Sequence, residues 1–209
     1  MTNKGSATLF SYWSKDIRYT TSNTITFEDK YGDHSVRVLA GQEAMRDKMD
    51  LLGLSSPKVN PLIPYPTTSP AADDQGNYNL VDESLLSFFG VFDYNYLNRY
   101  YLQASVRADG SSLFGSNNKW GVFWSVGGSW NVSKENWMKW SRQWLSALKI
   151  RASYGVNGNN NIAPYKAYGL YGTTQYNGIT GMVPSSPENP NLSWEKNATY
   201  NIGVDFGFF

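Results

Sequence analysis

Six charged side chains occupy alternate, polar positions in three long polar–apolar patterns. They are Arg107, Asp109, Lys149, Arg151, Glu195 and Asp205. Since successive side chains of a strand point to opposite faces, each pattern predicts a strand with one charged face and one apolar face. Such charges can contact a polar ligand, or they can solvate and brace the polar face itself. We prefer bracing, because most ion pairs at wet surfaces have no further role.

A second candidate group is a set of tyrosines within residues 158–192, a segment rich in Gly, Asn and Tyr that predicts a long loop. The set comprises Tyr165, Tyr168, Tyr171 and Tyr176. Tyrosine rings stack on sugars, and loops often carry binding specificity. Packing within the loop explains the same residues equally well, so both interpretations stay open.

The sequence offers no constellation for covalent chemistry. His34 is the only histidine and falls in a predicted turn, and the chain has no cysteine. The segment from Asp109 to Ser112 lacks the spaced acidic ligands of a calcium loop. We therefore expect no catalytic residue, metal site or cofactor, and a protein that is not an enzyme.

The clearest structural elements are two alternating segments around a Gly- and Ser-rich turn. Residues 101–109 place apolar side chains at even positions, and residues 120–132 repeat this with Trp and Val. The intervening segment 110–118 predicts a loop. Long strands with one dry and one polar face are suited to a boundary between lipid and water.

The remaining patterns extend this unit along the chain. Further strands are predicted over 20–30, 35–43, 86–96, 148–156 and 193–209, with a short helix starting at Ser133. Short turns at 31–34 and 97–99 contrast with long irregular connections at 45–82, 110–118 and 158–192. Aromatic residues fall near the strand ends, at Tyr94, Tyr96, Tyr100, Trp120, Trp130 and Trp194.

Alternating short and long connections and terminal aromatics are typical of outer-membrane barrels. We therefore predict an all-β fold: an antiparallel, up-and-down transmembrane β-barrel segment of about seven long strands, with long outer loops and one short helix.

The composition agrees with a membrane or sugar-facing protein. Aromatic residues make up 16% of the 209 residues and charged residues 17%, with a net charge of +1 and a mean hydropathy of −0.47. A chain so nearly neutral gives no reason to expect a nucleic-acid partner. The first eight residues lack the apolar core of a signal peptide, so Met1 is expected not to be the natural start.

Three motifs resemble SusC/RagA-type TonB-dependent outer-membrane receptors. They are Arg107–Gly115 with Asn118–Phe123, Leu148–Asn159, and Asn189–Glu195 with Asn201–Phe206. These segments are similar to RxDGSSxFG…NxWGxFPS, LKLRASYGxTGN and NPxLxWE…NIGxDF in that family. The chain differs where Trp124 replaces a usual proline, Leu113 a common basic residue and Val91 a frequent arginine.

The resemblance implies a barrel of about 22 strands with an internal plug. Residues 1–209 are then an internal part of that barrel, without signal peptide, plug or remaining strands. It also implies an outer-membrane location in a lipid bilayer and import of oligosaccharides or peptides. A SusD-like surface lipoprotein would be a partner, and the TonB complex would supply energy through the plug. The six charged residues would face the lumen, and the four tyrosines would lie in an outer substrate loop.

Two other classes of protein remain as alternatives. A soluble, aromatic-rich β-sandwich that binds glycans also shows alternation, with its apolar face in a core. Its strands are usually half as long as those predicted here. An outer-membrane enzyme ranks third, since no nucleophile and base are paired in the sequence.

Overall fold

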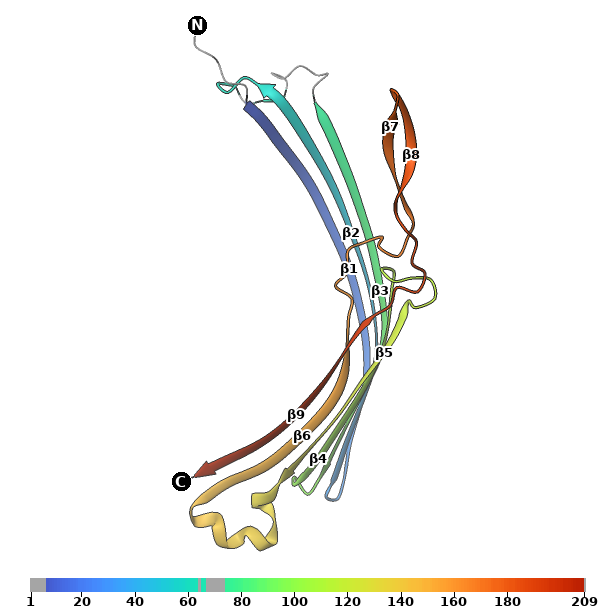
Figure 1. Cartoon of the computed structure of the whole chain (residues 1–209). Helices are drawn as coiled ribbons and strands as arrows, with labels where there is room; N and C mark the ends of the chain where they lie inside the picture. The colour runs from blue at the N-terminus through green and yellow to red at the C-terminus, as the bar shows by residue number, and fades with distance from the viewer. Residues whose placement is uncertain (1–6, 64, 67–73, 209) are drawn as a thin grey trace. The chain divides into compact units, whose positions relative to one another are not determined.

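The computed structural model describes residues 7–63, 65–66 and 74–208, and most of these lie in strands (Figure 1). Along the chain the elements are β1 (Ala7–Tyr31), β2 (His34–Val59), β3 (Gln75–Tyr96), β4 (Tyr100–Ser111), β5 (Trp120–Asn131), the 3-10 helices η3 (Val132–Lys134) and η4 (Asn136–Gln143), β6 (Leu145–Asn159), β7 (Leu170–Tyr176), β8 (Ile179–Ser186) and β9 (Glu195–Phe208). The chain divides into two compact units, Met1–Tyr19 with Arg46–Glu83, and Thr20–Met45 with Ser84–Phe209.

Within the described residues, seven strands form one sheet in the order β1-β2-β3-β4-β5-β6-β9, and β7 pairs with β8 alone. The register aligns apolar side chains across strands, for example Val106 opposite Trp124, and places Arg107 opposite Phe123. The predicted alternation is therefore confirmed, and the all-β, up-and-down architecture with it.

The apolar face of the second unit is open rather than covered. Val106, Val122 and Ile202 keep 51%, 55% and 80% of their surface exposed. In the described part of the chain no second layer of sheet lies on them, because the only other sheet is the β7–β8 hairpin. This observation contradicts the β-sandwich alternative, in which these side chains would form the core.

Two small clusters of buried side chains lie at opposite ends of the second unit. One combines Phe114, Phe123 and Trp194, beneath the connections after β4 and before β9. The other combines Val132 of η3, Met138 of η4 and Leu145 at the start of β6. Each cluster packs residues of a connection against residues of a strand, and so fixes the connection onto the sheet.

The first unit corrects the expectation of a loop over residues 45–82 and adds a strand segment that the sequence pattern does not indicate. Residues 7–19 and much of the predicted loop 45–82 are strand, in β1, β2 and the start of β3. Polar cross-strand pairs join them: Arg18 to Asp47, and Arg46 to Asp82 at 2.7 Å. Because both faces there carry polar groups, the apolar alternation that marks a strand is missing although the strands pair.

Two further expectations need correction in the second unit. The predicted loop 158–192 contains the β7–β8 hairpin, whose turn uses left-handed backbone at Asn177 and Gly178. In place of the predicted short helix there are two 3-10 helices, η3 and η4, separated by Glu135, and the second ends at Gln143. Trp194 lies directly before β9, near a strand end as expected, and its side chain is buried.

Candidate functional site

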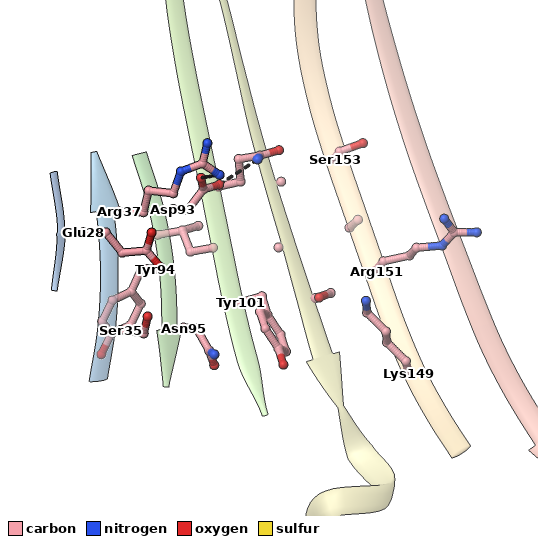
Figure 2. A pocket seen from close by; sticks show the side chains of 16 residues that line it. Glu28, Ser35, Arg37, Asp93, Tyr94, Asn95, Tyr101, Lys149, Arg151 and Ser153 are labelled. Carbon is pink, nitrogen blue, oxygen red and sulfur yellow. Dashed lines mark hydrogen bonds and ion pairs between the residues drawn. The ribbon is translucent and has the colours of Figure 1, made fainter. Parts of the chain in front are cut away.

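A hollow on the polar face of the second unit gathers side chains from β1 to β6 (Figure 2). Its labelled lining residues are Glu28, Ser35, Arg37, Asp93, Tyr94, Asn95, Tyr101, Lys149, Arg151 and Ser153. The register explains this convergence, because β6 presents alternate residues to the same face as alternate residues of β4 and β5. The lining offers charges of both signs, amides and hydroxyls, which suit hydrogen bonding to a polar ligand or protein segment.

The arginines on either side of this hollow lie close to carboxylates of opposite charge. Asp93 accepts a hydrogen bond from Gln103 at 2.7 Å and lies 3.6 Å from Arg37. On the other side, Arg151 lies 3.3 Å from the carboxylate of Asp205 in β9. Two of the six predicted charged residues therefore form a cross-strand pair.

Lys149 and Glu195 occupy separate parts of the polar face. The Lys149 ammonium lies 5.6 Å from the ring centroid of Tyr101, within cation–π range. Glu195 begins β9 and accepts a hydrogen bond from Asn159 at 3.0 Å. The predicted set thus shares one face without forming one cluster.

Arg107 is the centre of a second polar group, which joins β2, β3 and β4. Its Nε donates to Asp109 at 2.6 Å, and its Nη2 donates to Ser87 at 2.8 Å and lies 3.4 Å from Glu43. The guanidinium also lies 5.3 Å from the ring centroid of Phe89. Both Asp109 and Ser87 are buried. Contacts to three strands are what a bracing role requires, and a role in ligand contact stays a prediction.

The four tyrosines of the 158–192 segment do not form one cluster. Tyr165 and Tyr168 have ring centroids 6.4 Å apart at the base of the hairpin. Tyr171 lies in β7, and Tyr176 at its end is 84% exposed. Tyr168 and Tyr171 line a shallow pocket with Pro184, Pro187 and Glu188. Any substrate contact would therefore involve the base and the tip of the hairpin separately.

Sequence reasoning missed an aromatic cluster that joins two of the motifs. The Trp194 ring lies 4.7 Å from Phe114 and 5.3 Å from Phe123 between ring centroids. The Trp194 indole N–H donates to the carbonyl of Lys119 at 3.1 Å. Each motif supplies one or two aromatic residues beside turn residues, which is the sequence signal that could have indicated this packing.

Backbone hydrogen bonds complete the junction of the two loops. The amide of Gly115 donates to the Leu192 carbonyl at 3.0 Å, and that of Asn117 to the Pro190 carbonyl at 3.2 Å. A Cβ at position 115 would collide with the Pro190 carbonyl, so glycine allows this close approach. The two connections are therefore fixed to each other and to the sheet.

A second missed feature is the anchoring of the connector between β5 and β6. Glu135 is 8% exposed and accepts hydrogen bonds from Tyr100 at 2.5 Å, Trp130 at 3.0 Å and Arg99 at 3.3 Å. These donors stabilise the carboxylate, with Tyr100 first, and lower the pKa of Glu135 below its ordinary value. One acidic side chain thus holds the connector to β4, to β5 and to Arg99 in the turn before β4.

The arrangement defines a class of protein. No group of residues suited to holding a metal ion is found in the described ranges. In those ranges no helix is long and apolar enough to cross a membrane. Long antiparallel strands with an exposed apolar face and an opposite, ion-paired face are the construction of a β-barrel wall.

Comparisons with known proteins identify the family. The chain belongs to the family described as "TonB dependent receptor-like, beta-barrel", which matches residues 2–209. It is 34% identical over 192 residues to TonB-dependent receptor P39 of Formosa agariphila, covering 88% of this chain and 18% of that protein. It is 42% identical over 133 residues to SusC of Bacteroides thetaiotaomicron, covering 60% of this chain and 13% of SusC.

Solved structures agree with this assignment. A structure of the RagAB peptide transporter superposes with a TM-score of 0.84 at 30% identity, covering 96% of this chain and 23% of that one. The RagAB peptide importer in its closed-closed state gives a TM-score of 0.85. The predicted SusC/RagA-type resemblance is confirmed. The chain spans less than a quarter of each of these relatives, whose family consists of outer-membrane proteins.

Proposed function

We propose that this chain forms part of the barrel wall of an outer-membrane importer that takes up oligosaccharides or peptides. The apolar face of the sheet contacts lipid, and the polar face lines the passage. The observation that carries this proposal is the separation of the two faces. Exposed Val106 and Ile202 mark one face, and ion-paired Arg107 and Arg151 mark the other. Water on both faces would leave a large apolar surface exposed, which soluble monomers avoid.

Residues 1–209 are proposed to be one stretch of a larger barrel. β1 and β9 each have a single neighbour in the described sheet, so further strands are needed to close it. The limited coverage of the relatives, 18% for the Formosa agariphila receptor and 23% for RagAB, is in keeping with this arrangement.

The partners proposed for the whole protein follow from its family. The TonB complex would supply energy through a plug inside the barrel, and a SusD-like lipoprotein would cover the outer loops. The likeness to the RagAB peptide transporter supports a peptide substrate, and the resemblance to SusC/RagA-type receptors keeps oligosaccharides as the other proposed class. The barrel needs no covalent chemistry, cofactor or nucleic acid, so we propose a transporter rather than an enzyme.

Within this importer, the charged residues that border the open hollow contact the plug or the passing substrate, and the others brace the polar face. Arg151 and Lys149 border the open hollow, whereas Arg107 and Asp109 brace the face from within. Glu195 and Asp205 belong to the same face through their register with β6. The tyrosines of the β7–β8 segment would meet substrate before it enters.

The test is the behaviour of the expressed chain with and without detergent. We expect it to aggregate in buffer and to become monodisperse and strand-rich in detergent micelles or lipid vesicles. A monodisperse monomer in buffer alone, with cooperative unfolding, would refute the proposed lipid-facing role. Circular dichroism and size-exclusion chromatography with light scattering measure both properties.

A further inference from the structure

The connector between β5 and β6 has two unlike sides. Val132, Met138 and Leu145 form its buried side, and the Ser141 hydroxyl donates to the Met138 carbonyl at 2.8 Å. Three tryptophans of the connector are exposed instead: Trp137, Trp140 and Trp144 keep 59%, 67% and 48% of their surfaces accessible. Tryptophan is highly buried on average, so three exposed rings in eight residues require an explanation.

These tryptophans continue the apolar face of the sheet. Trp137 lies 6.4 Å from Trp130, and Trp144 stacks 6.2 Å from Phe208, between ring centroids. Trp130 pairs with Ile150 in the register of β5 and β6, and so belongs to the apolar face. The same aromatic row extends from Trp130 to Tyr100, at 6.3 Å. Whatever contacts the apolar face at this end therefore also reaches the connector.

The charges of the connector point to an anionic partner. Glu135 is buried and occupied by its hydrogen bonds to Tyr100, Trp130 and Arg99. Lys134 and Lys139 are exposed. The carboxylate of Glu135 is thus buried against the sheet, whereas Lys134 and Lys139 remain on the surface of the connector that also exposes the tryptophans.

We propose that the connector is a membrane-surface anchor, with its tryptophans in the lipid headgroup layer and its lysines at lipid phosphates. Amphipathic rings prefer the membrane–water boundary, and each nearby lysine adds attraction to anionic lipid. This inference rests on the proposed function, because it requires lipid against the apolar face. It adds that a non-strand segment binds the bilayer surface and fixes the barrel's depth at this end.

Single cysteine labels can test the anchor, since the chain contains no cysteine of its own. The full chain would be reconstituted in vesicles of phosphatidylethanolamine and phosphatidylglycerol. An environment-sensitive fluorophore would be attached in turn to Trp140→Cys on the connector, Val106→Cys on the apolar face, and Gln175→Cys on the β7–β8 hairpin. Phospholipids brominated near the headgroup or deep in the acyl chain then report the depth of each label.

We expect shallow bromines to quench the label at position 140 more strongly than deep ones, and its emission to shift to the blue. The order should reverse at position 106, and the label at position 175 should respond to neither. If position 106 is quenched and position 140 behaves like position 175, the anchor is refuted and the tryptophans are left for a protein partner. If position 106 is also unquenched, the proposed lipid-facing role itself fails.

A second variant keeps all three tryptophans. With the label at Asn136→Cys, the double change Lys134→Gln and Lys139→Gln should raise the anionic lipid needed for half-maximal shallow quenching by about fivefold per lysine. Lys196→Gln, an exposed lysine at the far end of β9, is the matched control and should leave the midpoint unchanged. Equal midpoints for the double variant and the control would overturn the role of the lysines at lipid phosphates.

Discussion

The junction of Phe114, Phe123 and Trp194 is predicted to hold the whole 158–192 segment in place. Ile162 and Leu192, near the two ends of that segment, both pack on this cluster. Removing the indole with Trp194→Ala should therefore release both ends of the segment together, while the strands of the sheet remain paired.

The size of the effect follows from the burial of the indole ring. Trp194 is 9% exposed, and truncating a buried aromatic residue to alanine costs about 3–5 kcal/mol. Because the cluster lies under loops that can partly relax, we take the lower limit of about 3 kcal/mol, which includes the hydrogen bond to Lys119. At about 1.4 kcal/mol per factor of ten, the local opening equilibrium should rise roughly 100-fold.

Limited trypsin digestion after Lys166 measures this opening. The Lys166 side chain is exposed, but the next residue, Ala167, is 5% exposed and its carbonyl accepts a hydrogen bond from Asn189 at 3.0 Å. Cleavage there requires the segment to open, and its rate follows the open population when closing is fast.

The matched control is Trp120→Ala, because Trp120 is 53% exposed and contributes nothing to the cluster. Its cleavage rate should stay close to that of the parent chain. A rise of less than about threefold for Trp194→Ala, or an equal rise in both variants, would refute the argument that the cluster secures the segment.

Three further outcomes are expected. Val106→Arg should destabilise the lipid-embedded chain by about 2–4 kcal/mol in urea titrations, whereas Gln103→Arg on the polar face should change it by less than about 0.5 kcal/mol; equal effects would contradict the assignment of faces. Gly115→Ala should cost about 1–3 kcal/mol, because its Cβ meets the Pro190 carbonyl, while Gly128→Ala, whose Cβ would lie an ordinary 3.5 Å from the Tyr101 carbonyl, should cost less in the same titration. Since the pKa of Glu135 is lowered in the folded chain, its stabilisation is complete above the ordinary glutamate value of about 4.3 and is lost as the pH falls below it. Glu135→Gln should remove this acid dependence from tryptophan fluorescence, and an unchanged acid profile would contradict the role of that carboxylate.

The sheet was predictable wherever its two faces meet different surroundings. Residues 101–109 and 120–132 alternate because one face is apolar and the other carries Arg107 and its partners, and the structure places both strands as expected. Residues 45–59 of β2 carry polar groups on both faces, so period-two alternation disappears, and the prediction of a loop was wrong for these residues and for the start of β3. Period-two alternation of apolar and polar residues indicates a strand only where the two faces of the sheet differ in polarity. A strand that pairs through its backbone but is polar on both faces leaves no such pattern.

The sequence predicted which residues of the candidate site share the polar face, but not which of their side chains are in contact. The register of β6 with β9 shows why Lys149, Arg151 and Asp205 share a face. Phe114 and Trp194 are far apart in the chain, and no local sequence pattern indicates that they are in contact. Their contact depends on the register of every strand pair that lies between the two loops.

The pairing of arginines on the polar face has an electrical consequence. Arg37, Arg107 and Arg151 lie 3.6, 2.6 and 3.3 Å from the carboxylates of Asp93, Asp109 and Asp205, respectively. Positive and negative charges cancel within a few ångströms, so their combined field decays quickly into the surrounding water. These three pairs therefore exert little attraction or repulsion on ions at a distance. We expect the movement of neutral solutes along this face to change little with ionic strength.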